Sequence, residues 1–223
     1  MNIVANNDKF ERQRRDLIDS LEEGKCITSP KVKAAMLKVR REDFVLGEYR
    51  DSAYNDYPLP IPSDATISAP HMHAMVLSEL NLKPGDCVLE VGAGSGILLA
   101  YMKELVGSKG EVTGIEIKID VYRFAKNNLE KSGYSKKVSM ILGDISRVAG
   151  KKKFDKIIVS ATSPDIPKVL VDMLKTNGML IIPVGNPNGS QTLVAVKKTS
   201  RITVMKDLGS VMFVPLEGEY GWK

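Results

Sequence analysis

The chain has 223 residues, of which 43% are hydrophobic and 26% charged, and a formal net charge of +5. This length suits one sizeable α/β domain with an elaboration, and the composition is ordinary for a globular enzyme. No stretch approaches the roughly 18 apolar residues of a membrane span, and the polar N-terminus lacks the apolar core of a secretory signal. The two cysteines, Cys26 and Cys87, lie far apart, which argues against a disulfide scaffold and a zinc site. We therefore expect a cytoplasmic protein with no membrane partner and no bound metal.

The positive charge raises the alternative of a nucleic-acid-binding protein. The lysines, however, are scattered, and the short clusters at 136–137 and 151–153 fall in predicted loops. No aromatic residues alternate with these lysines, as they would on a surface that stacks bases. A solvated basic surface is the better interpretation, and we expect no nucleic-acid partner.

Helices dominate the first 80 residues, where apolar positions recur at helical spacing. Ser29 with Pro30 opens one of these helices, and Ser68 is the expected N-cap of another. The prolines and tyrosines of 42–65 predict an irregular, packed loop. The predicted helices cover 8–24, 30–40 and 69–80.

Strands and helices alternate after residue 81. Short apolar runs that end in glycines or polar residues are typical of buried strands, and their alternation with helices predicts βαβ units. The last two strands are joined by a short turn and suggest an antiparallel edge. The predicted strands cover 87–91, 111–115, 138–142, 156–160, 178–183, 191–197 and 202–208, and the predicted helices cover 97–106, 120–132 and 167–174.

A glycine-rich loop at 91–96 lies between a predicted strand and a predicted helix. Glycines there permit a tight turn and let the backbone approach a ligand closely. The dinucleotide fingerprint G-x-G-x-x-G requires a glycine where Ile97 stands. The pattern E-x-G-x-G-x-G, which includes Gly92 and Gly94, favours a nucleoside ligand without a pyrophosphate.

Three carboxylates accompany this loop. Glu116 ends the second strand, where it can accept hydrogen bonds from a ribose diol, and Asp144 follows the third strand, where it can take an adenine amino group. Glu90, on the first strand, can meet a positively charged end of the ligand. Each of these residues could instead cap a loop. Together, at the carboxyl ends of successive strands, they predict a ligand crevice.

This order of motifs resembles the class I S-adenosylmethionine-dependent methyltransferases. The segments 154–159 and 174–182 look like the family's fourth and fifth strands, with Asn177-Gly178 where the family often has two glycines. The resemblance implies a doubly wound, mostly parallel sheet and S-adenosyl-L-methionine as the cofactor, with S-adenosyl-L-homocysteine as its product. Enzymes that methylate exocyclic base nitrogens usually carry an Asn/Asp-Pro-Pro-aromatic loop, and 160–164 reads Ser-Ala-Thr-Ser-Pro instead.

Three further segments resemble the protein-L-isoaspartate O-methyltransferase family: 66–74, 41–45 with Tyr54 and 58–60, and 213–216 with 221–222. The resemblance runs from about residue 10 to the C-terminus. It implies methylation of the free α-carboxylate of L-isoaspartyl residues, to initiate repair of damaged proteins. The chain departs from the family pattern at three places. The family often has glycine where Pro62 and Ile145 stand, and a small Ala-rich run where Thr162-Ser163 stand.

The resemblance also implies the roles of individual residues. Ser68 matches the active-site residue and, with Val214, Pro215 and Leu216, helps to hold the peptide substrate. The implied cofactor-binding residues are Ala65, Thr66, Ile67, His73, Glu90, Gly92, Gly94, Glu116, Ile117, Asp144 and Ile145. We interpret 1–223 as one domain and expect a monomer. In this domain, 1–80 forms a helical cap and substrate loop, and 81–223 forms the cofactor-binding core with the C-terminal strands.

The chemistry that this function requires is modest. An isoaspartyl α-carboxylate is ionised at neutral pH, so its attack on a sulfonium methyl needs orientation and desolvation rather than a strong base. Ser68 at a helix N-terminus suits an anion, although the same residue could be a plain N-cap. Alternative acceptors are a small-molecule carboxylate or RNA, and a protein that binds the cofactor without turnover is a third possibility.

Overall fold

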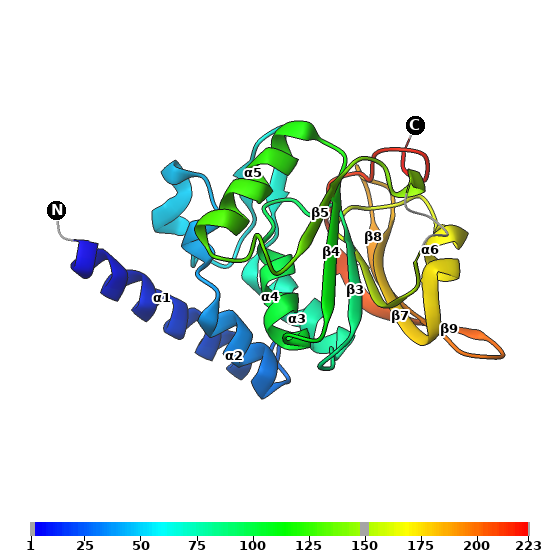
Figure 1. Ribbon diagram of the computed structural model, residues 1–223, viewed down its shortest axis with the longest axis horizontal. Helices are drawn as coiled ribbons and strands as arrows, with labels where there is room; N and C mark the ends of the chain where they lie inside the picture. Colours follow the sequence, from blue (N-terminus) through cyan, green and yellow to red (C-terminus); the bar gives the residue numbers. More distant parts are fainter. Residues whose placement is uncertain (1–2, 148–151, 223) are drawn as a thin grey trace.

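A computed structural model describes residues 3–147 and 152–222 (Figure 1). Its core is a seven-stranded sheet with the strand order β5-β4-β3-β6-β7-β8-β9. The strands from β3 to β7 pair in parallel, whereas β8 pairs antiparallel with both β7 and β9. The strands are β3 (Cys87–Val91), β4 (Glu111–Glu116), β5 (Ser139–Leu142), β6 (Phe154–Val159), β7 (Leu174–Gly185), β8 (Gln191–Lys198) and β9 (Thr203–Val211). The doubly wound, mostly parallel sheet with an antiparallel C-terminal edge is confirmed.

The strand order changes direction beside β3. The chain places β4 and then β5 on one side of β3 and returns to place β6 on the other side. Ligands of open α/β sheets bind at such a switch point, beyond the carboxyl ends of the strands, because the loops there diverge. The crevice is therefore expected between the loops that follow β3 and β6.

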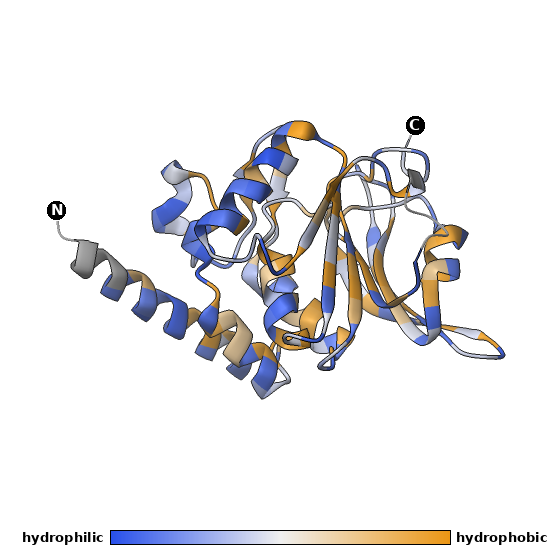
Figure 2. Ribbon diagram, viewed as in Figure 1, coloured by the Kyte–Doolittle hydropathy of each residue, from blue (hydrophilic) through white to orange (hydrophobic). Residues whose placement is uncertain are grey.

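Helices cover both faces of the sheet. Figure 1 shows α3 (Pro70–Leu80), α4 (Ile97–Val106) and α5 (Ile119–Lys131) on one side, with α6 (Lys168–Met173) on the other. Two buried apolar clusters fill these layers, and the alternation of side chains along β3 sends Val88 into one and Leu89 into the other. Figure 2 shows apolar residues concentrated on the strands and polar residues along the outer face of α5. Within the described residues, no helix is long and apolar enough to cross a membrane.

The N-terminal region packs against the α3 and α4 side of this core. It comprises α1 (Ile3–Glu23), α2 (Pro30–Lys38), two short 3-10 helices, η1 (Arg41–Asp43) and η2 (Gly47–Ser52), and the hairpin of β1 (Leu59–Ile61) with β2 (Ala65–Ile67). One buried cluster contains Phe10 and Ile18 of α1 together with Leu77 and Val88. This continuity supports the interpretation of a single domain, which stays a prediction.

The segment 42–65 is more regular than the sequence predicts. Besides η1 and η2 it contains β1, and Ser63 and Asp64 have φ values of 61° and 56° in the turn between β1 and β2. Ile61 pairs with Ala65, so a three-residue turn with two left-handed residues joins the strands of this hairpin. The proline-rich composition of this segment concealed the short strands.

The prediction that Ser68 caps α3 is wrong. The helix begins at Pro70, its N-cap position is Ala69, and no N-cap side chain makes a capping bond. The acceptor comes instead from the preceding loop, because Asp56 Oδ1 accepts the backbone N–H of His71 at 2.9 Å. A similar difference holds for Ser29, which occupies the N-cap position of α2 without a side-chain capping bond.

The turn expected at Asn177-Gly178 lies inside β7. Asn177 has a φ of 67°, and the register jumps so that Phe154 pairs with Leu174 while Lys156 pairs with Met179. The turn is therefore a large bulge within one strand, because the residues on both sides of it pair with β6.

Candidate active site

A single cavity of about 270 Å³ lies at the predicted crevice. Every residue that the sequence analysis assigned to the cofactor, the substrate or catalysis lines it. These residues are Ala65, Thr66, Ile67, Ser68, His73, Glu90, Gly92, Gly94, Glu116, Ile117, Asp144, Ile145, Val214, Pro215 and Leu216. The structure thus brings together segments from β2, the loops after β3 to β6, and the C-terminal tail.

The glycine loop forms the floor of this cavity between β3 and α4. Gly94 and Gly96 have φ values of 55° and 84°, in the left-handed region that favours glycine. A Cβ atom at Gly96 would also lie 3.2 Å from Leu129 Cγ of α5. The loop needs glycine for its backbone conformation and for the close packing of α5.

Glu116, at the end of β4, is held in place by backbone donors. Its Oε2 accepts the N–H of Gly94 at 3.0 Å, and its Oε1 accepts the N–H of Lys118 at 3.1 Å. Burial raises the pKa of this carboxyl, and the backbone donors oppose the rise. Each carboxylate oxygen has a second lone pair, so the side chain can still accept hydrogen bonds from a ligand.

Glu90, on β3, has a hydrogen-bond partner for only one of its two carboxylate oxygens. Its side chain is 2% exposed, and its Oε1 accepts the hydroxyl of Ser160 at 3.0 Å. Its Oε2 is buried without a hydrogen-bond partner. Burial raises the pKa of Glu90 well above its ordinary value, although the Ser160 bond opposes this. A buried, unpartnered carboxylate oxygen beside a cavity indicates a site for a cationic donor.

Ser68 and His73 form the opposite wall. Within the described residues the Ser68 hydroxyl makes no hydrogen bond, and its backbone carbonyl accepts from Arg41 Nη2 at 2.9 Å. His73 is 7% exposed, and burial lowers its pKa well below the ordinary value, so its ring is neutral at pH 7.

The start of α3 is a weaker anion site than the sequence predicts. Pro70 has no N–H, Asp56 accepts the N–H of His71, and Ala69 O accepts the N–H groups of Met72 and His73. The first-turn donors are therefore occupied, and the Ser68 hydroxyl is the group that remains available for an anion.

The C-terminal tail closes the cavity from the side of β6. Thr162 donates its N–H to Val214 O and accepts the N–H of Leu216, both at 2.8 Å. The Trp222 ring N–H donates to Thr162 O at 3.1 Å. These bonds fasten 214–216 beside the loop after β6, about 50 residues away in sequence, because that loop and the tail pair as a short parallel bridge.

Asp144 links the tail to the loop after β5. Its Oδ1 accepts the N–H of Ser146 and its Oδ2 that of Glu219, both at 2.8 Å. Lys118 makes a second link, because its Nζ contacts Ser63 O at 3.0 Å and Glu217 Oε1 at 2.8 Å. The β1–β2 turn, the loop after β4 and the tail therefore meet at one rim of the cavity.

Several residues of this site were not among those predicted from the sequence. Ser160, Lys118 and Glu217 line the cavity, and Arg41 lies directly behind Ser68 and His73. Ser160 stands at the carboxyl end of β6, and that position could have identified it. No local sequence signal marks Lys118 or Glu217, because their contacts are made between distant segments, whereas Arg41 begins the segment 41–45 that resembles the family.

Comparison with protein families decides the classification. Residues 12–221 match the family model described as protein-L-isoaspartate(D-aspartate) O-methyltransferase. The chain belongs to this family.

Relatives in the protein-L-isoaspartate O-methyltransferase family span almost the whole chain. Proteins of that name from Hyperthermus butylicus and Pyrococcus horikoshii are 45% and 46% identical to it, over 222 and 216 residues. The matches cover 96% of this chain in both cases, and 92% and 96% of the relatives.

A solved structure shares the fold and the family. It is a Plasmodium falciparum protein assigned as a protein-L-isoaspartate O-methyltransferase, in complex with S-adenosyl-L-homocysteine. It is 30% identical to this chain, with a TM-score of 0.81 over 90% of this chain and 96% of the other. The predicted family is confirmed at the level of both sequence and fold.

Proposed function

We propose that this chain transfers a methyl group from S-adenosyl-L-methionine to the free α-carboxylate of L-isoaspartyl residues in damaged proteins. The observation that carries this proposal is the single cavity in which the glycine loop, the segment 65–68 and the tail 214–216 meet. These are the segments that resemble the family, and they come from distant parts of the chain. The family match over residues 12–221 supports the same reaction.

The described residues fit the cofactor. Glu90 Oε2 is a buried acceptor without a partner, which suits the ammonium group at the methionyl end. Glu116 is held by Gly94 and Lys118 with lone pairs left for a ribose diol, and Asp144 with Ile145 borders the same cavity for the adenine. When bound, this cofactor supplies an electrophilic methyl group on a positively charged sulfur.

The acceptor needs position rather than deprotonation. Its α-carboxylate is ionised at neutral pH, so the protein does not have to remove a proton before the oxygen–methyl bond forms and the sulfur–methyl bond breaks. The Ser68 hydroxyl is available to donate to a carboxylate oxygen, and Val214 and Leu216 offer an apolar wall. Together they orient the carboxylate and exclude water. Holding reactants in the correct geometry can lower a reaction barrier by about 7–11 kcal/mol.

The product would be an α-methyl ester, from which a methoxy group leaves far more readily than an oxygen leaves the free carboxylate. Attack by the neighbouring backbone nitrogen would release methanol and close a succinimide, and hydrolysis of that ring would return a share of normal aspartyl residues. The family's name and reaction imply this repair outcome for the chain.

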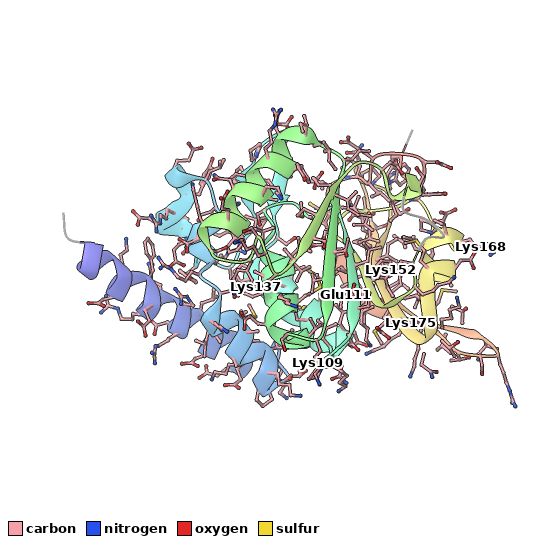
Figure 3. The ribbon with its side chains drawn as sticks, in the orientation of Figure 1. Lys109, Glu111, Lys137, Lys152, Lys168 and Lys175 are labelled. Atoms are coloured by element: carbon pink, nitrogen blue, oxygen red, sulfur yellow. The ribbon has the colours of Figure 1, made fainter. Side chains whose placement is uncertain are left out.

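Ion pairs of surface lysines support a solvated basic surface rather than a nucleic-acid interface. Several lysines on the β6–β7 side are paired with acidic residues: Lys152 with Glu111, and Lys175 with Asp155 at 2.7 Å. Figure 3 shows Lys168 and Lys175 extending outward from different elements rather than lining one groove. Lys151, the first residue of that predicted cluster, lies outside the described residues.

We further propose that the enzyme acts as a cytoplasmic monomer. The described chain supplies every wall of the cavity by itself, and Cys26 and Cys87 are free thiols, as expected in a reducing compartment. Light scattering during size-exclusion chromatography tests the oligomeric state, and a dimer mass would contradict the proposal.

The central experiment measures transfer of labelled methyl to a matched pair of peptides, one isoaspartyl and one aspartyl. We expect base-labile label on the isoaspartyl peptide alone. The Ser68→Ala variant should lose at least tenfold in kcat/KM, while Ser200→Ala, in the exposed turn between β8 and β9, should match the parent protein. Label on neither peptide, with cofactor binding intact, would refute the proposed acceptor.

A further inference from the structure

Arg41 is a buried cation directly behind the wall of the cavity. Its side chain is 1% exposed, and Nε donates to Ala53 O at 2.8 Å. Its Nη2 donates to Ser68 O at 2.9 Å, and its Nη1 lies 3.5 Å from His73 Nδ1. Two of these three contacts are therefore made to residues that line the cavity.

This guanidinium has no carboxylate within ion-pair distance in 3–147 and 152–222. Burial lowers the pKa of Arg41 to about 10, so it remains charged at neutral pH. A buried charge that is not neutralised by an acid is costly, and proteins retain one mainly where its donors hold specific acceptors. The acceptors here are two backbone carbonyls and one histidine nitrogen.

A buried polar network beside Arg41 holds the backbone of η1, and its members do not line the cavity. Tyr54 Oη accepts the backbone N–H of Arg41 at 3.2 Å and donates to Glu42. Arg14 of α1 donates to the same Tyr54 hydroxyl at 2.6 Å and to Glu42 at 3.0 Å. These bonds hold the backbone of η1 against α1 and Tyr54, and none of them is made to the Arg41 guanidinium.

We infer that Arg41 is a positioning residue, which holds the Ser68 peptide and fixes His73 in the tautomer with its proton on Nε2. The inference rests on the proposed use of the cavity. An arginine can only donate, so His73 Nδ1 must present its lone pair to Nη1. The ring proton then resides on Nε2, which makes His73 a donor toward a carboxylate oxygen bound in the cavity.

Charge around His73 agrees with this assignment. The groups that face it are Arg41 from η1, His71 on its own helix and the Tyr101 ring of α4, which meets it edge-on at 5.9 Å. Burial and the Arg41 charge both lower the pKa of His73. A neutral ring with a defined tautomer offers one N–H donor from a residue that lines the cavity together with Ser68, without adding a second positive charge to that of Arg41.

The test reads the tautomer directly and does not depend on activity. Nitrogen-15 NMR of the full chain distinguishes a protonated from an unprotonated ring nitrogen. In the parent protein we expect His73 Nδ1 unprotonated and Nε2 protonated, and a proton on Nδ1 would overturn the inference. In Arg41→Met we expect a mixture of tautomers.

Kinetics provide the second readout, with Arg14→Met as the matched control. Arg14 is a partly buried arginine with several hydrogen bonds, and its partners Tyr54, Leu37 and Glu42 do not line the cavity. We expect Arg41→Met to lower kcat/KM for the isoaspartyl peptide at least tenfold, and Arg14→Met to lose stability while it keeps the His73 tautomer and the KM values.

The kinetic split also identifies which carboxylate His73 serves. Weaker binding of S-adenosyl-L-homocysteine to Arg41→Met would assign the donor to the cofactor carboxylate. A higher peptide KM with unchanged binding of this product would assign it to the acceptor carboxylate. Either result supports the positioning role. The inference would be overturned if Arg41→Met changed neither the binding of S-adenosyl-L-homocysteine nor the peptide KM. It would also be overturned if Arg14→Met, when as stable as Arg41→Met, showed the same changes. Because the tautomer is measured without turnover, it stays informative even if the chain methylates a different acceptor.

Discussion

Replacing Glu90 by Gln should strengthen the fold and weaken the cofactor site at once. Glu90 is 2% exposed, and its Oε2 has no hydrogen-bond partner. An unsatisfied buried polar group costs about 1–3 kcal/mol, and more when it is charged. The amide has nearly the same shape and can keep its oxygen on the Ser160 hydroxyl, but its NH₂ group stays unpartnered. We therefore expect a net gain of about 1 kcal/mol without ligand, or about 2–4 °C in Tm for a chain of this size.

The gain should depend on pH in a defined direction. Burial raises the folded-state pKa of Glu90 above its ordinary value of 4.5. The stability that this group contributes is complete below pH 4.5 and is lost as the pH rises through the folded-state pKa. The advantage of Glu90→Gln should therefore be absent below pH 4.5 and grow toward neutral pH. Chemical denaturation of both proteins without ligand, over this pH range, measures it.

Glu90→Gln should weaken cofactor binding, although it stabilises the protein without ligand. A charge-assisted hydrogen bond contributes about 1.5–3 kcal/mol, so S-adenosyl-L-methionine should bind Glu90→Gln roughly 10- to 150-fold more weakly. Calorimetry in two buffers of different ionisation enthalpy should also show proton release on binding to the parent protein, because the ammonium group favours the ionised carboxylate. The variant should release less.

Glu116→Gln is the matched control. Both oxygens of Glu116 accept backbone N–H groups, so an amide NH₂ there would face a donor and should destabilise the fold by about 1–3 kcal/mol. We therefore expect Glu90→Gln to stabilise the protein and Glu116→Gln to destabilise it. The reasoning is refuted if Glu90→Gln is less stable than the parent at pH 8, or if its stability difference is the same at all pH values.

Three further changes test the packing and the rim. Gly114→Ala should cost about 1–3 kcal/mol in denaturant unfolding with KM unchanged, because its Cβ would lie 2.7 Å from a leucine side chain of α4; an unchanged midpoint would contradict this. Lys118→Met removes the ion pair with Glu217 at the cavity rim, so product release measured by stopped flow should quicken severalfold, while stability changes by less than about 1 kcal/mol; an unchanged release rate would count against the link. Asp56→Ala should lower the free energy of unfolding by about 1 kcal/mol in thermal unfolding, because the His71 N–H loses its acceptor. Unchanged stability would show that Asp56 does not cap α3.

The strands and the glycine loop were predictable because their signals are local. The runs at 87–91 and 111–115 are short and apolar, and the structure places β3 and β4 over nearly the same residues. Glu116 and Asp144 were predictable for a second reason: the carboxyl ends of parallel strands meet at one edge of the sheet. An ordering of elements was therefore enough to bring these side chains to one cavity.

The capping of α3 was not predictable in the same way. A serine followed by Ala-Pro is a typical N-terminal pattern, but the donor of His71 is satisfied by Asp56, fifteen residues earlier. Such a bond depends on how the loop before β1 folds over the helix. The sequence contains both residues without indicating that they meet.

By itself, then, the sequence determined the alternation of strands and helices, the nucleoside-binding loop and the family, because periodicity and motifs act over a few residues. Only the tertiary structure decided that Glu90 keeps one oxygen unpartnered, that Arg41 lies behind Ser68 and His73, and that the tail crosses to Asp144. These features depend on burial and on contacts between segments far apart in the chain. Burial sets the free energy of a charge, and it exists only once the layers have packed.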